Sequence, residues 1–461
     1  MARGASDDVE VRRAVRLTVR LGEAGAVPAA GSWGGVGDGA GAEAGGGVQV
    51  RRARVVTGDE GDDELGGDGD GRRVADEDEG IEELGEGEGA DAPAVTLADA
   101  ARADLRSGKR IVISLDSGVM YDDNIYLRGV DPVADTLWRV GGEVRLNSGD
   151  VVRQEDSHLA VMYRLEAYFF HENTGENTVD HEATLSWRRK FAKLAVDAAG
   201  KYQRTSGSTV DLGDRVPRDV VVARAGLVHE ATAKVRVGTV VRWDSTTYRE
   251  GAYSDYREWA HDGYADYQVT EKFQLGLGGT YGRLEVDDGS EPQDFQRAMM
   301  RVRYAATGKL DVAGRVGSEF RQTEVGDTAT PVFGLEATHD LTGKTSVRLL
   351  GVREVAASGS LEGQNYVRTG VSGGVTHRLS ERLSVGLDGG WEQYEYEAAS
   401  KAALGLADRT DNGVFVRPGF TYVLGDRWKA EAWYQWRSSD STDPTQEYDV
   451  NQAGINLRCE F

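Results

Sequence analysis

The sequence has little of what helical membrane proteins or disulfide-stabilised proteins contain. None of its 461 residues lie in an apolar run of the roughly 20 positions that a membrane-spanning helix needs. The single cysteine, Cys459, excludes an intrachain disulfide and a cysteine-based zinc cluster. Eight prolines and 61 glycines suit many turns better than long helices. The net charge of −23 argues against a nucleic-acid partner, which would need a basic face.

Residues 1–108 have a different composition from the rest of the chain. Between Asp59 and Asp91, sixteen Asp or Glu residues stand against two Arg, interleaved with glycine. Such a tract buries too little apolar surface to offset its ordering entropy, so we expect residues 1–108 to be disordered. The first 25 residues also lack the apolar stretch of a secretory signal, which predicts a misassigned start codon or a frame error.

From about residue 109 to 461, apolar and polar residues alternate with the period of a β-strand. A short phrase recurs every 35–45 residues or so, about the length of two spanning strands with their turns. It consists of a polar residue or glycine followed by Lys or Arg, and it appears at 270–273, 307–310, 342–345, 380–383 and 425–428. This spacing predicts about eighteen strands (16–18) of about 10–15 residues, with both ends of the barrel in the periplasm.

The alternation separates two faces on each predicted strand. After Lys272, the residues Phe273, Leu275 and Leu277 share one side, and Gln274 and Gly276 share the other. Alternation alone is also compatible with a soluble β-sandwich. The length of the strands and the aromatic residues near their ends favour a closed antiparallel transmembrane β-barrel of the outer membrane. We therefore expect an all-β fold whose apolar face contacts outer-membrane lipid.

The last strand carries the most specific motif in the chain. Apolar residues alternate up to the terminal aromatic residue, namely at Ile455, Leu457, Cys459 and Phe461. This pattern resembles the signal that the barrel assembly machinery recognises in outer-membrane proteins. It implies that the assembly machinery is a partner of this chain.

Residues 110–461 resemble the outer-membrane β-barrel porin families of Gram-negative bacteria. The segments that carry the resemblance are Ser117–Tyr126, with its Tyr-Asp-Asp-Asn phrase, and Leu457–Phe461. Barrels associated with exopolysaccharide operons are the nearest of these families. The resemblance implies an outer-membrane location, and it adds polysaccharide-export components and a homotrimer as expected partners.

The inward face of the predicted barrel carries charges of both signs, because a lumen of this size holds water. The expected lumen-lining residues are Arg297, Arg301, Arg303, Arg315, Asp311, Glu319, Asp388 and Glu392. Three of the arginines lie on one face of one strand and would attract anions if they were unpaired. The alternative interpretation is that these charges are solvated and paired across strands.

The sequence predicts no enzyme, no metal site and no cofactor. The seven histidines are scattered over different strands, and no catalytic triad or phosphate-binding loop is present. The predicted function is a passive channel for small polar solutes or one that assists exopolysaccharide export. A structural or adhesive barrel with a closed lumen is the alternative, and a barrel hydrolase is a more distant one. The predicted loops are short, the longest being 122–134 and 398–410, so they offer little material for a plug.

Overall fold

The computed structural model describes residues 15–19, 48–52, 111–149, 157–208, 210–212, 214–249, 253–307, 309–405 and 409–461. Of the predicted disordered segment 1–108, it describes only β1 (Val15–Val19) and β2 (Val48–Arg52), which pair antiparallel. The prediction for the rest of that segment lies outside the described residues. No helix in the described part of the chain is long and apolar enough to cross a membrane.

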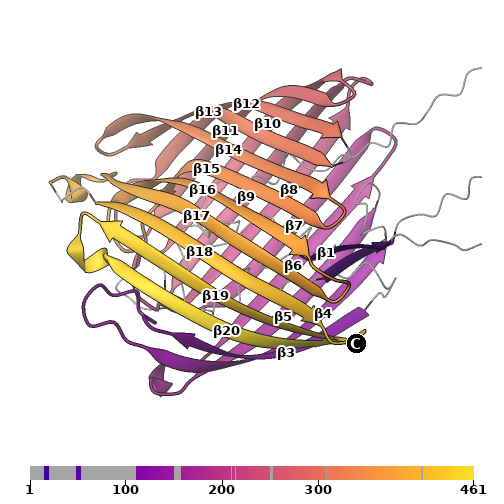
Figure 1. Ribbon diagram of the computed structural model, residues 1–461. Helices are drawn as coiled ribbons and strands as arrows, with labels where there is room; N and C mark the ends of the chain where they lie inside the picture. The colour runs from indigo at the N-terminus through magenta and orange to yellow at the C-terminus, as the bar shows by residue number, and fades with distance from the viewer. Residues whose placement is uncertain are drawn as a thin grey trace, which may run out of the picture.

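Eighteen antiparallel strands, β3 to β20, form a closed barrel, because the last strand pairs with the first. Figure 1 shows the strands running obliquely around the barrel wall. This confirms the predicted fold class and strand number. The strands are β3 (Ile111–Asp122), β4 (Asp135–Gly149), β5 (His158–Phe170), β6 (Thr178–Lys190), β7 (Leu194–Thr205), β8 (Arg218–Glu230), β9 (Val235–Tyr248), β10 (Tyr256–Thr270), β11 (Phe273–Val286), β12 (Gln293–Thr307), β13 (Leu310–Thr323), β14 (Gly326–Thr342), β15 (Thr345–Ala357), β16 (Gln364–Arg378), β17 (Leu383–Ala398), β18 (Thr410–Val423), β19 (Trp428–Ser441) and β20 (Tyr448–Glu460).

The two ends of the barrel differ in the length of their connections. The recurring phrase forms the tight turns after β10, β12, β14, β16 and β18, all at the end where the C-terminus lies. Most of the longer connections, which include the short helices η2 (Thr174–Glu176), η3 (Lys401–Ala403) and η4 (Pro444–Gln446), lie at the other end. Outer-membrane barrels keep short turns in the periplasm and long loops outside the cell. The loop end is therefore the extracellular mouth.

The predicted faces of the strands are confirmed. Leu277 on β11 is 69% exposed on the outside of the barrel, whereas Gln274 and Thr280 on the opposite face are buried. Several glycines on the inner face make room for large rings on the neighbouring strand. A Cβ atom at Gly282 would collide with the ring of Phe295, and one at Gly454 would collide with the indole of Trp433. Some of the many glycines therefore allow aromatic side chains to lie flat against the inner wall.

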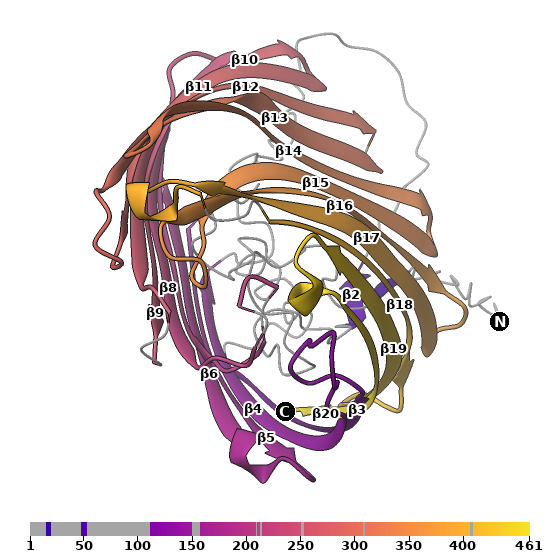
Figure 2. The same ribbon diagram turned by 90° about the vertical axis from the view of Figure 1, so that its left-hand side faces the viewer.

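The wall does not remain fully paired along its whole height. Strands β14 and β15 pair from Thr342 up to Phe333, which lies opposite Arg353, and no further. Above that level, β14 pairs only with β13, and β15 pairs only with β16. Figure 2 looks onto the loop end and shows β10–β14 and β15–β20 as two arcs. We call this unpaired stretch between β14 and β15 the seam.

Beside the seam, the tip of the β15–β16 hairpin lies inside the barrel. By the alternation of side chains along β16, Asn365 should face outward. Its side-chain amide nevertheless donates to Gln293 on the inner face of β12 at 2.7 Å. Ala357 is likewise on the outer parity and packs against Tyr256 and Leu284 of the inner wall. The extracellular half of the hairpin therefore lies inside the barrel, against the inner face of β10–β12.

The lipid-facing assignment predicts a strong depth-dependent penalty for charge. Leu277→Arg places a cation in the apolar band and should destabilise the barrel by about 2–4 kcal/mol. Thr338→Arg on the inner face of β14 is the matched control and should change little, because its side chain reaches lumen water. Urea unfolding in lipid bilayers, followed by tryptophan fluorescence, measures both variants. Equal stability of the two would contradict the face assignment.

Candidate functional site: the extracellular mouth and the lumen

The described residues of the β7–β8 loop, 206–208, 210–212 and 214–217, turn into the mouth of the barrel (Figure 2). Ser208 and Arg215 form an isolated β-bridge within it, and Val210, Leu212 and Val216 are buried. The Ser208 hydroxyl donates to the carbonyl oxygen of Ile125 at 3.0 Å. This bond ties the loop to the β3–β4 connection on a distant part of the wall. The loop is thus held inside the mouth from more than one side.

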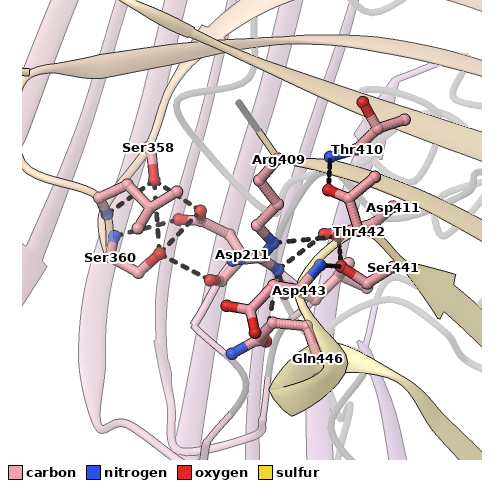
Figure 3. Close-up of polar contacts among 12 residues, drawn as sticks. Asp211, Ser358, Ser360, Arg409, Thr410, Asp411, Ser441, Thr442, Asp443 and Gln446 are labelled. Atoms are coloured by element: carbon pink, nitrogen blue, oxygen red, sulfur yellow. Dashed lines mark hydrogen bonds and ion pairs between the residues drawn. The ribbon is translucent and has the colours of Figure 1, made fainter. Parts of the chain in front are cut away.

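Asp211, only 3% exposed, connects the β7–β8 loop to the tip of the β15–β16 hairpin. Its carboxylate accepts hydrogen bonds from the Ser358 hydroxyl at 2.6 Å and from the Gly359 backbone N–H at 2.7 Å. The backbone N–H of Ser360 donates to the same carboxylate at 3.3 Å, and the Ser360 hydroxyl lies 3.1 Å from it. Figure 3 shows these groups converging on one side chain. We call this contact the Asp211 latch.

Arg409 holds the other side of the same loop. Its guanidinium donates to the carbonyl oxygen of Val210 at 3.0 Å and forms an ion pair with Asp411 at 2.6 Å (Figure 3). The guanidinium also donates to the Gln446 side chain at 3.3 Å and lies over the ring of Tyr396. One arginine therefore joins the β7–β8, β17–β18 and β19–β20 connections.

A hydrophobic cluster fills the space around these polar contacts. It contains residues from the loops and from the inner face of the wall, namely Leu127, Val210, Ala356, Tyr366, Tyr394, Tyr396, Phe415, Tyr448 and Val450. A second cluster beside β3–β5 contains Met120, Ile125, Leu137, Tyr168, Phe170 and Trp433. Burial of this much apolar surface stabilises the inward position of the loops. The prediction that the loops offer little plug material is therefore wrong, because residues 206–217 and the hairpin tip were counted as an ordinary loop and as wall.

Glu324, in the β13–β14 turn, contacts the loop that follows β17. Its carboxylate accepts hydrogen bonds from the backbone N–H groups of Glu291 and Lys401 at 2.7 and 3.2 Å. These two donors lower the pKa of Glu324 below its ordinary value. A lowered carboxyl pKa stabilises the contact above the pH at which a free glutamate titrates, and this stabilisation is lost as the pH falls. The loops at the mouth are thus joined more firmly at neutral than at acidic pH.

All the predicted lumen-lining residues lie on the inner face, and most have opposite charges beside them. Arg297 forms an ion pair with Glu319 at 2.7 Å, and Glu319 also pairs with Arg321 at 2.7 Å. Arg301 lies 3.4 Å from Asp266, and Arg303 lies 3.2 Å from Asp311. The arginine-rich face of β12 is therefore compensated by acidic residues on β10 and β13. The interpretation that these charges are paired across strands therefore describes the three arginines better than an anion-attracting lining does.

The remaining predicted lining residues also have cross-strand neighbours. Glu392 forms an ion pair with Arg437 at 3.0 Å, and the hydroxyl of Tyr394 donates to it at 3.0 Å. Asp388 lies directly opposite Arg417 on β18, and Arg315 lies opposite Arg301 on β12. The inner face thus carries charged residues of both signs on neighbouring strands.

The residues of the predicted assembly signal occupy the outer face of β20. Ile455 and Leu457 are exposed there, and the backbone N–H of Phe461 donates to the carbonyl oxygen of Ile113. Cys459 has the same parity but is only 4% exposed, since it lies between Leu115 and Trp428 in the register. Recognition of this strand by the assembly machinery remains a prediction.

Sequence reasoning identified the lining but missed the latch. Asp211, Ser358, Ser360 and Arg409 lie in connections whose inward direction has no periodic signal. The apolar residues Val210, Leu212 and Val216, in a segment between two strands, were the available sign that this loop is buried. In the described part of the chain, no group of three or more His, Cys, Asp or Glu side chains could hold a metal ion.

The comparisons with known proteins agree with this architecture. Residues 312–461 match the family described as "Putative beta-barrel porin 2". This match confirms the predicted resemblance to the β-barrel porins. Together with the closed barrel of spanning strands, it supports an outer-membrane location for this β-barrel. No curated protein matches the chain.

Solved structures of outer-membrane barrels are similar only in general outline. OpdK of Pseudomonas aeruginosa, solved with vanillate, is 11% identical, with a TM-score of 0.41 over 76% of this chain and 99% of that one. OccAB3 of Acinetobacter baumannii is 10% identical, with a TM-score of 0.41 over 76% of this chain and 98% of that one. The siderophore receptor PirA of Pseudomonas aeruginosa is 9% identical, with a TM-score of 0.38 over 77% and 80%. Likenesses at this level do not indicate a shared solute.

The compensation of the lumen arginines predicts the effect of removing one carboxylate. Glu319→Gln leaves the buried Arg297 and Arg321 without their shared partner and should destabilise the barrel by about 3 kcal/mol. It should also shift the reversal potential of any conducting state toward anions. Asp311→Asn, whose carboxylate is half-exposed beside Arg303, is the control and should have a small effect. If the two variants unfold at the same urea concentration, Glu319 does not neutralise this site.

Proposed function

We propose that this barrel is a passive channel of the outer membrane for small polar solutes, and that the described structure is its closed form. The observation that carries the proposal is the combination of a charged inner wall with loops that are held inside the mouth. A wall lined with charges of both signs needs water or polar solute beside it, because a dry lumen would penalise the charges heavily. The Asp211 latch and Arg409 hold the loops across the route to that lumen.

A barrel without transport is the second candidate, since the same loops close the mouth. The mode of closure distinguishes the two. A permanently closed barrel would not need exchangeable contacts at its mouth, whereas here, beside the hydrophobic clusters, the β7–β8 loop is held by hydrogen bonds to one carboxylate and one guanidinium. Hydrogen bonds to charged groups contribute about 1.5–3 kcal/mol each, so a few can be exchanged when the loops move. This balance favours a channel that opens.

Further parts of the proposal rest on the resemblance and on the sequence. Assistance in exopolysaccharide export, with export components as partners, rests on the segments Ser117–Tyr126 and Leu457–Phe461. A homotrimer, contact with the assembly machinery and the absence of catalysis belong to the same proposal. Outer-membrane lipid is the expected partner of the apolar outer face.

The latch predicts a change in channel activity. Asp211→Ala removes the acceptor for Ser358, Gly359 and Ser360, so the loop should leave the mouth more often and the open fraction should rise several-fold. Single-channel recording of the full chain in planar bilayers measures this fraction. Asp214→Ala is the matched control, because this carboxylate in the same loop has local contacts instead: it accepts a hydrogen bond from the backbone N–H of Arg215 at 2.8 Å and forms an exposed ion pair with Arg128 at 3.8 Å.

Three outcomes separate the candidates. Steady ohmic openings that become more frequent in Asp211→Ala and not in Asp214→Ala support the gated channel. Silence of the natural chain and of both variants, in barrels that still show heat-modifiable migration, favours the closed structural barrel. Equal openings in all three proteins would show that the latch does not close the mouth.

A further inference from the structure

The unpaired edge of β14 points its hydrogen-bonding groups toward β15. The backbone N–H of Asp340 donates to Lys309, so even-numbered residues of β14 bond to β13 and odd-numbered ones face β15. From Gly326 to Val332 the described strands provide no partner on that side. Phe320 of β13 lies opposite Ala329 of β14 and is 53% exposed on the outer face. The unpaired edge therefore lies at the level of lipid-facing side chains. An open edge at that level is unusual, because nothing in a bilayer core can bond to it.

Proline stands in the middle of this edge. Pro331 is odd-numbered, so the N–H that it lacks would have pointed into the seam. Prolines in sheets are confined to places where the ladder needs no donor, which are edges above all. The sequence of β14 therefore tolerates separation from β15 at this position, because Pro331 has no backbone hydrogen bond to lose there.

The hairpin tip nevertheless has the side-chain pattern of barrel wall. The positions that should face outward are apolar, as lipid-facing positions are: Val355, Ala357 and Val367. At positions that should face inward, Glu354 and Arg368 form an ion pair. In the structure all three are buried instead of facing lipid, and Ala357 packs against Tyr256 and Leu284 of the inner wall. The same alternation thus suits two positions of the tip.

Polar contacts hold the tip in its inward position. They are the Asp211 latch, the amide pair of Asn365 and Gln293, and the bond from the Gly363 N–H to Asp288 at 2.8 Å. The backbone N–H of Ser254 also donates to the carbonyl oxygen of Gly359. These bonds would be exchanged for ladder bonds if the tip joined β14, so the net difference between the two positions is a small number of hydrogen bonds.

We propose that the tip of the β15–β16 hairpin is the gate of this channel, and that it opens by moving outward and pairing with the free edge of β14. Continuing the observed register places Val355 opposite Pro331 and Ala357 opposite Ala329. The movement closes the seam and turns Val355 and Ala357 toward lipid. It also withdraws Ser358 and Ser360 from Asp211, which removes one of the contacts that hold the β7–β8 loop in the mouth. This gate rests on the proposed channel function, but the movement itself can be measured without any conductance.

Engineered cysteine pairs distinguish the two positions of the tip, in a Cys459→Ala background that contains no other cysteine. Ala329→Cys with Ala357→Cys can form a disulfide only when the tip is paired with β14, at the roughly 5.5 Å Cα separation of such pairs. Gln293→Cys with Asn365→Cys traps the inward position. Ala337→Cys with Leu349→Cys is the control, because these residues already face each other across β14 and β15.

The expected result is that all three pairs cross-link under oxidation, with the outward pair forming more slowly than the control. The oxidised outward pair should raise the open fraction several-fold, and the oxidised inward pair should abolish openings. Reduction should restore the natural behaviour in both. Heat-modifiable migration of each variant confirms that the barrel has assembled before any comparison is made.

The contrary results are equally specific. If the control cross-links and the outward pair does not, the tip does not reach β14 and the gate is refuted. An outward pair that links two separate chains shows that the edge accepts a second molecule instead, which also refutes it. Efficient outward cross-linking with silence in every variant overturns the channel function while leaving the movement established.

Discussion

The structure depends on one constraint: inside a bilayer every backbone N–H and C=O group must find its partner within the protein. A closed ladder from β3 around to β20 satisfies this constraint along the wall, except at the seam between β14 and β15. Closure in turn requires every strand to alternate between a lipid face and a lumen face, which explains the composition of the sequence. A chain with modest overall hydrophobicity can therefore be a membrane protein, because only half of each strand is apolar.

The inner face of this barrel is lined with charged side chains, unlike its apolar exterior. Arg297, Glu319 and Arg321 form a chain of ion pairs on neighbouring strands, and similar pairs recur around the inner wall. Because each strand supplies its charges at the same parity, the pairs arise directly from the register. Glycines such as Gly282 and Gly454 complete this wall by admitting aromatic rings from the next strand. Charge pairing and ring packing together make the inner surface rigid, and leave the loops as the parts able to move.

The sequence predicted the barrel well because its signal is repeated on every strand. Period-2 alternation and the recurring turn phrase predicted eighteen strands, and both faces of β11 were assigned correctly. Strand length was predicted less accurately: strands of about 10–15 residues were expected, whereas β14 has 17, from Gly326 to Thr342. The mouth could not be predicted, since the direction of a loop is decided by contacts between residues far apart in sequence, such as Asp211 and Ser358. The inward position of the β15–β16 tip was hidden for a related reason, because its alternation suits the wall equally well.

The position of Trp433 has a spectroscopic consequence. It faces the lumen beside Gly454 and Arg417, whereas the other described tryptophans, Trp138, Trp187, Trp243, Trp259, Trp391, Trp428 and Trp436, have the parity of the lipid face. Brominated acyl chains quench the fluorescence of indoles that they contact. In bilayers made of such lipids, the fluorescence of these seven tryptophans should therefore be quenched, while Trp433 continues to emit. The emission that survives then comes largely from one side of the wall, provided that Trp33, outside the described residues, is replaced. The barrel thus carries its own optical probe of the packing on its inner wall.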